Sequence, residues 1–442
     1  MAQPLWRAGK KGCWHMASIL IDGHNLGLVK GTGVATYARN LSLEATHLGH
    51  DVSVVYGQAF GNKGNPLLRE IAFFDPKLEK PKKHEVALNM LTYGLHGPFS
   101  QHPREVTLSG SVIRRAQASR MPECKRIYNG TDLFNRASAG FAMTGRMTKV
   151  RLDDQHDLAH WTYPLPIRAP GCPNIYTLHD LVPLRLPYTT LDNKKRYFKL
   201  MQRIAREADH IVTVSECSKR DIMDLLGIEE TRITNTYQSV HIPQAMLELD
   251  EEQVAREVEG ATGAAYKEYY LFWGSIEPKK NIERMIEAFL SSGVQRPLVI
   301  VGAQAWKSED SLKLLKNKRL QGDRRIVQLT YAPFTMLVSL IRGARAALFP
   351  SLYEGFGLPA LEAMTLGTPV IASNTASLPE VVGDAALSVD PYSAREIAAA
   401  LRKLDNDDDL RDEYVRRGHE RVKLFSPQTY RERLESLYRR VL

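Results

Sequence analysis

The chain has 442 residues, of which 43% are hydrophobic and 25% charged, and its formal net charge is +9. Because single hydrophobic cores stop growing at roughly 250–300 residues, two or three domains of an ordinary globular protein are expected. No apolar run approaches the roughly 18 residues that a membrane-spanning helix needs, and we expect no secretory signal peptide. The four cysteines lack CxxC spacing, which excludes a disulfide framework or zinc site and favours reduced thiols in the cytoplasm.

Residues 1–16 predict a disordered basic arm, because they show no periodicity and carry Arg7, Lys10 and Lys11. Met16 is an equally good candidate for the initiator, because the first predicted strand begins directly after it.

Residues 18–57 predict one strand–helix–strand unit. The short apolar run at 18–23 is typical of a central parallel strand, and 52–56 predicts the next strand. Between them, the turn Lys30-Gly31-Thr32-Gly33 precedes apolar residues at helical spacing. This turn would lie at the carboxyl end of the first strand, where doubly wound sheets bind ligands.

Residues 58–150 are the least regular part of the chain, and 61–150 carry 15 Lys and Arg against 7 Asp and Glu. This surplus suggests an anionic partner such as a phospholipid surface or a lipid phosphate; the alternative is a solvated basic face. No RNP motif, C2H2 finger or helix-turn-helix pattern is present, so no nucleic-acid partner is expected. Basic residues (Arg114, Arg115, Arg120, Lys125, Arg126, Arg136, Arg146, Lys149) alternate with apolar ones (Ile113, Met121, Ile127, Tyr128, Leu133, Phe134, Phe141), which suits an amphipathic helix or loops on a charged apolar surface.

Periodic order returns at 174–180, a predicted strand that ends in His179 and Asp180. A helix is predicted at about 192–208, a strand at 211–214, and a further helix with Ser215 as its N-cap. The charged, helix-like connector near 243–263 contains the expected domain boundary.

A second strand–helix series follows. Two such series predict an α/β protein with two Rossmann-like doubly wound domains that face each other across a cleft. The expected domains are 17–262 and 263–425, and a basic helix at 426–442 is expected to pack back on the N-terminal domain. Strands are predicted at 269–273, 297–301, 326–329, 346–349, 369–372 and 386–389, and helices at 282–290, 308–315, 335–343, 358–366, 394–404 and 410–425. The acidic run 405–409 lies between two of these helices and indicates capping and surface charge.

The stretch 349–363 places Glu354 and Glu362 eight positions apart, on either side of a Gly-x-Gly turn. The apolar run before it predicts a buried strand, and Pro359 marks the first turn of a helix. A strand, a glycine turn and a helix start together expose backbone N–H groups to an anion. From the spacing alone, a tight turn with two solvated glutamates is an equal alternative.

Ordered sequence blocks decide between these alternatives. In the C-terminal half they are 274–281 (GSIEPKKN), 299–306 (VIVGAQAW), 349–362 (FPSLYEGFGLPALE), 367–370 (GTPV) and 378–383 (LPEVVG). In the N-terminal half they are 31–37 (GTGVATY), 177–183 (TLHDLVP) and 214–220 (VSECSKR). In this order they resemble the retaining, nucleotide-sugar-dependent glycosyltransferases of family 4, which have the GT-B fold. The resemblance covers about 17–57 and 157–442 and leaves 58–150 outside.

The resemblance implies that 263–425 binds a nucleotide sugar and that the N-terminal domain binds the acceptor. Lys280 would supply a positive charge to the diphosphate. Lys279 would take the second cationic role, because Ser275 stands where many relatives have arginine. Gly31 and Gly33 would approach the phosphates from the opposite domain. The alternative for the two lysines is a solvated pair before a helix that Asn281 caps.

The resemblance also implies that Glu362 accepts hydrogen bonds from the ribose hydroxyls and that Glu354 lies near the transferred sugar. His179 matches the family's histidine that faces the sugar; a structural histidine at the strand end is its alternative. Asp180 is expected to anchor the following turn. Further contacts are expected from the N–H groups of Phe356, Gly357 and Leu358 at the donor, and from His160 and Trp161 at the acceptor.

The implied reaction is hexose transfer with retention, through front-side attack in which a donor phosphate oxygen takes the acceptor's proton. A double displacement on Glu354 is less favoured. No cofactor and no metal are expected beyond the nucleotide-sugar substrate. The expected donor is GDP-mannose, with other NDP-hexoses open, and the expected acceptor is a lipid-linked, lipopolysaccharide or exopolysaccharide glycan.

We expect a cytoplasmic protein that the basic segment holds peripherally on the inner face of the cell membrane. The alternative is a catalytically silent GT-B scaffold, which Ser275 would permit and the four residues Glu354, Glu362, Lys280 and His179 argue against. A phosphorylase or epimerase is not favoured, because no lysine set for a pyridoxal cofactor is present.

Overall fold

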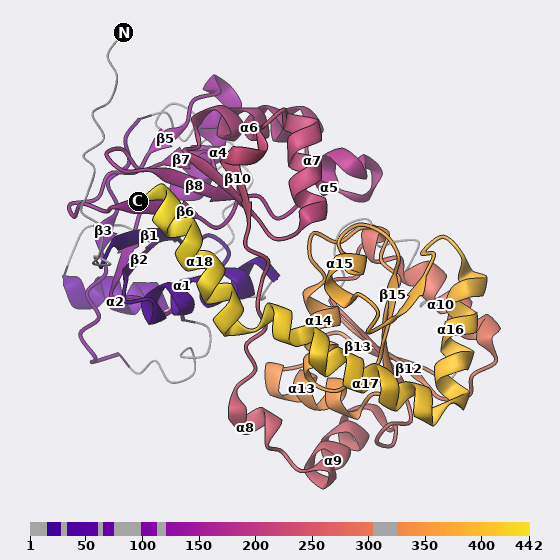
Figure 1. The fold of residues 1–442 in the computed structure, drawn as a ribbon. Helices are drawn as coiled ribbons and strands as arrows, with labels where there is room; N and C mark the ends of the chain where they lie inside the picture. Colours follow the sequence, from indigo (N-terminus) through magenta and orange to yellow (C-terminus); the bar gives the residue numbers. More distant parts are fainter. Residues whose placement is uncertain (1–15, 28–32, 61–64, 75–98, 113–120, 304–324) are drawn as a thin grey trace, which may run out of the picture.

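The computed structural model describes residues 16–27, 33–60, 65–74, 99–112, 121–303 and 325–442. It contains one large, mainly parallel sheet in each half of the chain, and the predicted α/β class with two such sheets is confirmed (Figure 1). Four predicted features lie wholly or partly outside the described residues: the arm at 1–15, the turn residues 30–32 that include Gly31, the helix at 308–315, and part of the basic segment at 61–150, including Ile113, Arg114, Arg115 and Arg120.

The first sheet has eight strands in the order β10-β9-β8-β6-β1-β2-β4-β3. Neighbouring strands are parallel except β3 and β4. The inner strands are buried along almost their whole length because helices cover both faces, which explains their continuous apolar runs. The bounds are β1 (Ser18–Asp22), β2 (Asp51–Tyr56), β3 (Arg104–Glu105), β4 (Arg126–Asn129), β6 (Leu158–Trp161), β8 (Asn174–Thr177), β9 (His210–Thr213) and β10 (Ile233–Asn235), with a separate pair β5 (Thr148–Lys149) and β7 (Ile167–Arg168).

The helices of this half are α1 (Gly33–His47), α2 (Pro66–Phe74), α4 (Leu133–Thr144), α5 (Val182–Arg185), α6 (Lys194–Glu207) and α7 (Glu216–Leu226). The N-cap prediction for Ser215 is confirmed, because its side chain accepts a hydrogen bond from the N–H of Ser218 at 3.0 Å. Across the described ranges, no helix has both the length and the apolar character to cross a bilayer.

The expectation that 58–150 is irregular agrees with the described residues 99–112, in which β3 is the longest element, but it is wrong for 126–144. Strand β4 pairs with β2 in the main sheet, and α4 follows directly after it. The apolar residues expected to rest on a charged surface are instead core residues: Ile127, Tyr128, Leu133, Phe134 and Phe141 are all buried. Their burial removes the apolar half of the proposed amphipathic surface, while basic neighbours such as Arg126 stay exposed.

The second sheet has six parallel strands in the order β13-β12-β11-β14-β15-β16. Every strand predicted in this half is found within one or two residues of its expected bounds. The strands are β11 (Tyr270–Trp273), β12 (Leu298–Val301), β13 (Ile326–Leu329), β14 (Ala346–Phe349), β15 (Val370–Ser373) and β16 (Leu387–Val389). The helices are α10 (Ile282–Ser292), α13 (Phe334–Gly343), α14 (Leu358–Thr365), α15 (Leu378–Val382), α16 (Ala394–Asn406) and α17 (Asp408–Val422).

The connector between the sheets forms α8 (Gln244–Leu247) and α9 (Glu251–Thr262). Helix α9 packs against α13 of the second sheet's layer, and its Val254 and Val258 are buried. Helix α9 therefore packs as part of the C-terminal half. The chain crosses between the two sheets before residue 251, earlier than the expected boundary at 262.

The last helix, α18 (Pro427–Val441), leaves the C-terminal half and lies against α1 (Figure 1). Arg431 donates to the buried Glu44 at 2.7 Å, and the hydroxyl of Tyr438 lies 3.0 Å from Nδ1 of His160. These contacts fasten the chain terminus to the first sheet.

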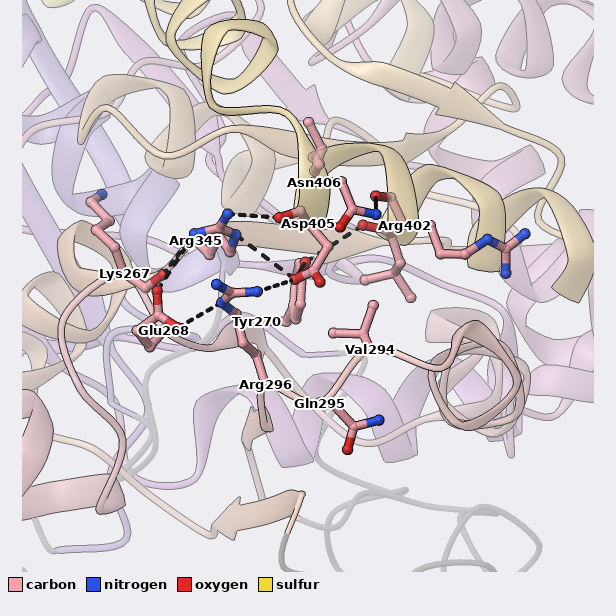
Figure 2. A network of polar contacts seen from close by, with 12 residues as sticks. Lys267, Glu268, Tyr270, Val294, Gln295, Arg296, Arg345, Arg402, Asp405 and Asn406 are labelled. Carbon is pink, nitrogen blue, oxygen red and sulfur yellow. Dashed lines mark hydrogen bonds and ion pairs between the residues drawn. The ribbon is translucent and has the colours of Figure 1, made fainter.

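A polar network stabilises the amino-terminal edge of the second sheet (Figure 2). Asp405 accepts hydrogen bonds from Arg296 at 2.9 Å and from the hydroxyl of Tyr270, the first residue of β11, at 2.8 Å. Arg345, whose side chain is only 8% exposed, donates to the carbonyl of Asp405 at 2.7 Å. The acidic run therefore includes one partly buried structural carboxylate besides the predicted cap, since Asp407 does cap α17.

Candidate active site

Several of the predicted site residues lie just beyond the carboxyl ends of parallel strands, the edge at which doubly wound sheets bind ligands. His179 follows β8 by two residues, and Glu354 lies between β14 and α14. The two loops come into contact: a Cβ on Gly355 would lie only 2.8 Å from the carbonyl oxygen of His179. The structure thus brings the candidate histidine and the candidate glutamate loop together from different domains.

Lys280 and Glu354 form a buried ion pair. The Nζ atom of Lys280 lies 2.7 and 2.9 Å from the two carboxylate oxygens, and the hydroxyl of Ser351 donates to the first of them at 2.7 Å. Their side chains are 13% and 10% exposed, so the alternative of solvated side chains is wrong for this pair. Burial alone would raise the pKa of Glu354, but Lys280 and Lys279 hold that pKa below its usual value.

Lys279 is a second cation beside this pair. Its Nζ lies 3.8 Å from Oε1 of Glu277, and its side chain is largely buried. Burial opposes the charge, but the surrounding carboxylates, led by Asp180 of the other domain, raise the pKa of Lys279. The lysine is therefore held in its charged form at the junction of the two domains.

Asn281 fixes the turn that presents both lysines, but not as the predicted N-cap. Its φ of 59° is left-handed, which asparagine tolerates, and its side chain makes no capping hydrogen bond. Instead Nδ2 donates to the carbonyls of Pro350 at 2.9 Å and Pro391 at 2.7 Å. Asn281 therefore ties the lysine turn to the segment that carries Glu354.

Glu362 lies one turn into α14 and accepts a hydrogen bond from the indole N–H of Trp273 at 2.9 Å. Burial raises the pKa of Glu362 to about 7, and the Trp273 N–H limits that rise. The Trp273 ring packs edge-on against Phe349, with centroids 4.8 Å apart. Trp273 orients the carboxylate, and 89 residues of chain separate the two, so the sequence offered no local signal for this contact.

The turn before α14 is shaped by Gly357, whose φ is 110°. A Cβ there would also lie 2.7 Å from the side chain of Leu378. The Oγ of Ser377 lies 2.8 Å from the carbonyl oxygen of Glu354 and 2.7 Å from that of Phe356, and it can donate its one proton to either. As at any helix start, the first N–H groups, including that of Leu358, have no partner within the helix.

His179 is held as a neutral ring. Its Nε2 lies 2.9 Å from the carbonyl oxygen of Thr162, so that nitrogen carries the proton. Burial lowers the pKa of His179, and the edge of the ring meets Tyr37 at a centroid distance of 4.8 Å. Asp180 anchors the following turn as predicted, because its Oδ1 accepts from the N–H of Val182 at 3.1 Å.

Three other predicted site residues form no hydrogen bond or ion pair with the charged residues described above. Gly33 is exposed at the start of α1, where a Cβ would meet nothing within 4 Å. His160 and Trp161 are fully buried and so do not line an open acceptor face. His160 bonds Tyr438 and Thr177, and Trp161 donates to Asn174 at 3.0 Å, so both are core residues of the first sheet.

An aromatic group at the carboxyl edge of the first sheet was not predicted from the sequence. The ring of His24 lies 5.6 Å from Tyr163 and 5.0 Å from Phe134. Tyr163 is partly exposed, and burial of its hydroxyl, with the nearby charges of Asp192 and Asp180, raises the pKa of Tyr163 to about 12. These residues come from three separate segments, so only the fold assembles them.

The chain matches two family models: Glycosyl transferases group 1 over residues 259–421 and Glycosyltransferase Family 4 over residues 114–241. The second match begins inside the segment expected to lie outside the resemblance, which is a correction. O-antigen chain mannosyltransferase B of Escherichia coli is 33% identical over 57% of this chain and 66% of its own length. Serotype-specific mannosyltransferase WbdA of Escherichia coli is 29% identical over 56% of this chain and 31% of its own length. The chain thus spans less than two thirds of either relative.

A third relative matches along nearly the whole chain: the MMP alpha-(1->4)-mannosyltransferase of Mycolicibacterium hassiacum is 25% identical over 93% of this chain and 95% of its own length. Among solved structures, sucrose-phosphate synthase of Thermosynechococcus elongatus matches with a TM-score of 0.64 and 18% identity, over 96% of this chain and 98% of its own. Anabaena HepE with UDP and glucose matches with a TM-score of 0.66 and 14% identity, over 96% and 99%.

The two parallel-sheet domains, the solved structures that match them over 96% of the chain, and the two family models together show the GT-B fold. The chain belongs to the family-4 glycosyltransferases.

Proposed function

We propose that this protein transfers a hexose from a nucleotide sugar to a glycan acceptor. One observation carries the proposal: the buried Lys280–Glu354 pair, with Lys279 beside it, lies where the two domains meet at His179. A nucleotide-sugar diphosphate gains negative charge as the glycosidic bond breaks, and fixed cations in a water-poor site stabilise that charge.

Donor binding divides among three groups of the C-terminal domain. Lys280 and Lys279 meet the diphosphate, together with the N–H groups at the start of α14, where a helix favours anions. Glu362 accepts hydrogen bonds from the ribose hydroxyls, and Trp273 orients its carboxylate. Glu354 approaches the hydroxyls of the transferred sugar. Its carboxylate is ionised and can therefore accept hydrogen bonds from those hydroxyls.

The reaction proceeds with retention and without a metal. The acceptor hydroxyl attacks the anomeric carbon from the face that the diphosphate leaves; a new C–O bond forms as the C–O bond to phosphate breaks. The hydroxyl proton passes to an oxygen of the departing phosphate. The two lysines supply the positive charge that a divalent cation supplies elsewhere. Neutral His179 keeps its protonated Nε2 on Thr162, so it positions the sugar and takes no proton through that nitrogen.

The donor we propose is GDP-mannose, and the acceptor a lipid-linked or polysaccharide glycan. The support is that the three curated relatives described above are all named as mannosyltransferases, one of them for O-antigen chains. Glycogen synthase of Mycobacterium tuberculosis, 32% identical over 46% of this chain, supports another NDP-hexose as the second candidate.

The acceptor side of the proposal rests on the rings of His24 and Tyr163, with the buried Phe134 packed behind His24. Aromatic rings with a few polar groups commonly line binding sites, and a sugar can stack its apolar face on them. A neutral hexose at the end of the acceptor glycan would lie against Tyr163.

We also propose a cytoplasmic location with peripheral contact to the inner membrane face. Support comes from the basic surplus at 61–150 and from α2, whose Leu67, Leu68 and Ile71 are exposed. Sedimentation with vesicles of anionic or zwitterionic lipid tests this contact; equal recovery with both compositions argues against an electrostatic role.

The decisive experiment measures nucleoside diphosphate release from a panel of nucleotide sugars, with and without glycan acceptor. Acceptor-stimulated turnover of one donor supports the proposal. If folded protein turns over none of them, the silent scaffold becomes the better account.

A further inference from the structure

Helix α7 belongs to the first sheet's layer, yet its first two turns face the C-terminal domain (Figure 1). The carboxylate of Glu380, on α15, accepts hydrogen bonds from the backbone N–H groups of Glu216 at 2.9 Å and Cys217 at 3.1 Å. A helix start has free N–H groups and a positive dipole end, so a carboxylate from the other domain is a favourable partner.

Ser218, in the same turn, lies between the two loops of the candidate site. Its Oγ is 2.8 Å from the carbonyl oxygen of His179 and 3.2 Å from that of Gly355, and it can donate its one proton to either. Ser218 is fully buried, and its own N–H is fixed by the Ser215 cap. Its hydroxyl therefore joins the backbone beside the candidate histidine to the backbone beside Glu354.

Close packing leaves little room at this point. A Cβ on Gly355 would approach Oδ2 of Asp180 to 3.0 Å as well as the His179 carbonyl. One turn further along α7, Asp221 accepts a hydrogen bond from the hydroxyl of Tyr353. Arg185 of α5 fixes Asp221 from the N-terminal side at 2.8 Å. The two neighbours of Glu354 in the chain are thus both in contact with the N-terminal domain. Tyr353 bonds Asp221 of α7, and Gly355 packs against Ser218 and the loop of His179.

We propose that the first turns of α7 are a positioning element for glycosyl transfer, with Ser218 as its central residue and Glu380 as its clasp. The element sets the spacing between His179 and Glu354 when the domains are together, and it touches neither substrate. The expected effect on kcat rests on the proposed function. The expected effect on the association of the two domains does not depend on turnover.

The kinetic test compares Ser218→Ala with Ser215→Ala. Both remove a buried serine hydroxyl from the start of α7, but only Ser218 bridges the domains. We expect Ser218→Ala to lower kcat at least tenfold with the donor KM within threefold of wild type. Ser215→Ala should lower Tm through the lost cap and keep kcat within threefold. Equal kcat losses in both variants, or a wild-type kcat in Ser218→Ala, would overturn the proposal.

The structural test compares Glu380→Ala with Asp384→Ala by small-angle scattering of the full chain with GDP. Asp384 is an exposed carboxylate just after α15, 3.9 Å from Arg417. Glu380→Ala should increase the radius of gyration, because the clasp is lost, while Asp384→Ala should match wild type. An unchanged radius in Glu380→Ala would refute the clasp. If wild type turns over no sugar nucleotide, the proposed function fails and this comparison alone decides the inference.

Discussion

The ammonium group of Lys280 contacts both carboxylate oxygens of Glu354, at 2.7 and 2.9 Å, across 74 residues of chain. The pair is buried, and Lys279 adds a second positive charge beside it. A preorganised charge pair needs no rearrangement at the moment a leaving group develops charge, which is the arrangement that favours transition-state stabilisation.

Replacing Lys280 should damage both binding and turnover. Lys280→Ala removes a phosphate cation and leaves the buried Glu354 with one cation fewer, which in other proteins costs about 3–5 kcal/mol of stability. We expect the Kd for nucleoside diphosphate, measured by calorimetry, to rise at least tenfold. Lys403→Ala on the exposed face of α16 is the control and should bind as wild type. Unchanged affinity in Lys280→Ala would remove the lysine from the site.

Replacing Glu354 should separate binding from transfer. Glu354→Gln keeps the shape but loses the charge that faces the sugar, so kcat should fall about 100-fold. Nucleotide affinity should stay within threefold, because Lys280 keeps its charge and gains the phosphate as its partner. The measurement is a parallel determination of kcat and of nucleotide Kd. Wild-type kcat in Glu354→Gln would mean that this carboxylate does not act on the transferred sugar.

Glu362 should make donor binding depend on pH. Its pKa is raised to about 7, and the ionised form accepts ribose hydrogen bonds best, so the donor KM should fall as pH rises through 7. Trp273→Phe removes the N–H that favours the charged form and should move this transition to higher pH. In Glu362→Gln the transition should disappear. A transition that persists in Glu362→Gln must come from another group.

The raised pKa of Glu362 also predicts how the free energy of unfolding changes with pH. Because the folded-state pKa of Glu362 lies above the ordinary 4.5, the unfolded chain releases this proton first as pH rises. Wild type should therefore lose stability relative to Glu362→Gln between pH 4.5 and 7, with a constant difference above 7. Urea unfolding at the two ends of this window measures the effect, and parallel curves for the two proteins would contradict it.

Asp405 should matter for stability and not for chemistry, because it lies at the amino-terminal edge of the second sheet (Figure 2). Asp405→Ala strips Arg296 and Arg345 of their shared carboxylate and should destabilise the protein by about 3 kcal/mol in urea unfolding. Asp409→Ala, at an exposed position, is the control and should change the free energy of unfolding by less than about 0.5 kcal/mol. A loss of kcat per folded molecule in Asp405→Ala would show that the two edges are coupled.

Tyr163 should act on the acceptor alone. Tyr163→Ala removes a ring from the aromatic group and should raise the acceptor KM about tenfold while the donor KM stays within threefold. Tyr163→Phe keeps the ring and should retain most of the affinity. If both variants shift the donor KM instead, the ring belongs to the donor side.

The strand–helix alternation of the C-terminal half could be predicted because most of its strands are short apolar runs, and β11, β12, β14 and β15 have glycine or proline directly beside them. Strand β4 could not: Arg126–Asn129 is short and begins with a charge, and only its pairing with β2 makes it a strand. The burial of Phe134 and Phe141 follows from that pairing, and it overturned the expectation of an apolar surface there.

Lys280 and Glu354 could each be selected as a site candidate from the local motif that contains it, although their contact across 74 residues could not be predicted. The candidate site was not predictable where a contact joins distant segments. Trp273 reaches Glu362 across 89 residues, and Ser218 reaches Gly355 across 137, so neither partner is visible without the fold. Asn281 shows a third limit: a residue type typical of caps takes a left-handed conformation and bonds distant carbonyls instead.

The most direct test of the central claim is GDP release from GDP-mannose by the purified full chain, with and without a mannose-terminated glycan, followed by NMR of the product. The account predicts GDP release that the acceptor stimulates at least tenfold, and a product with the anomeric configuration of the donor. An inverted product would contradict the mechanism, and no turnover of any nucleotide sugar by folded protein would contradict the function itself.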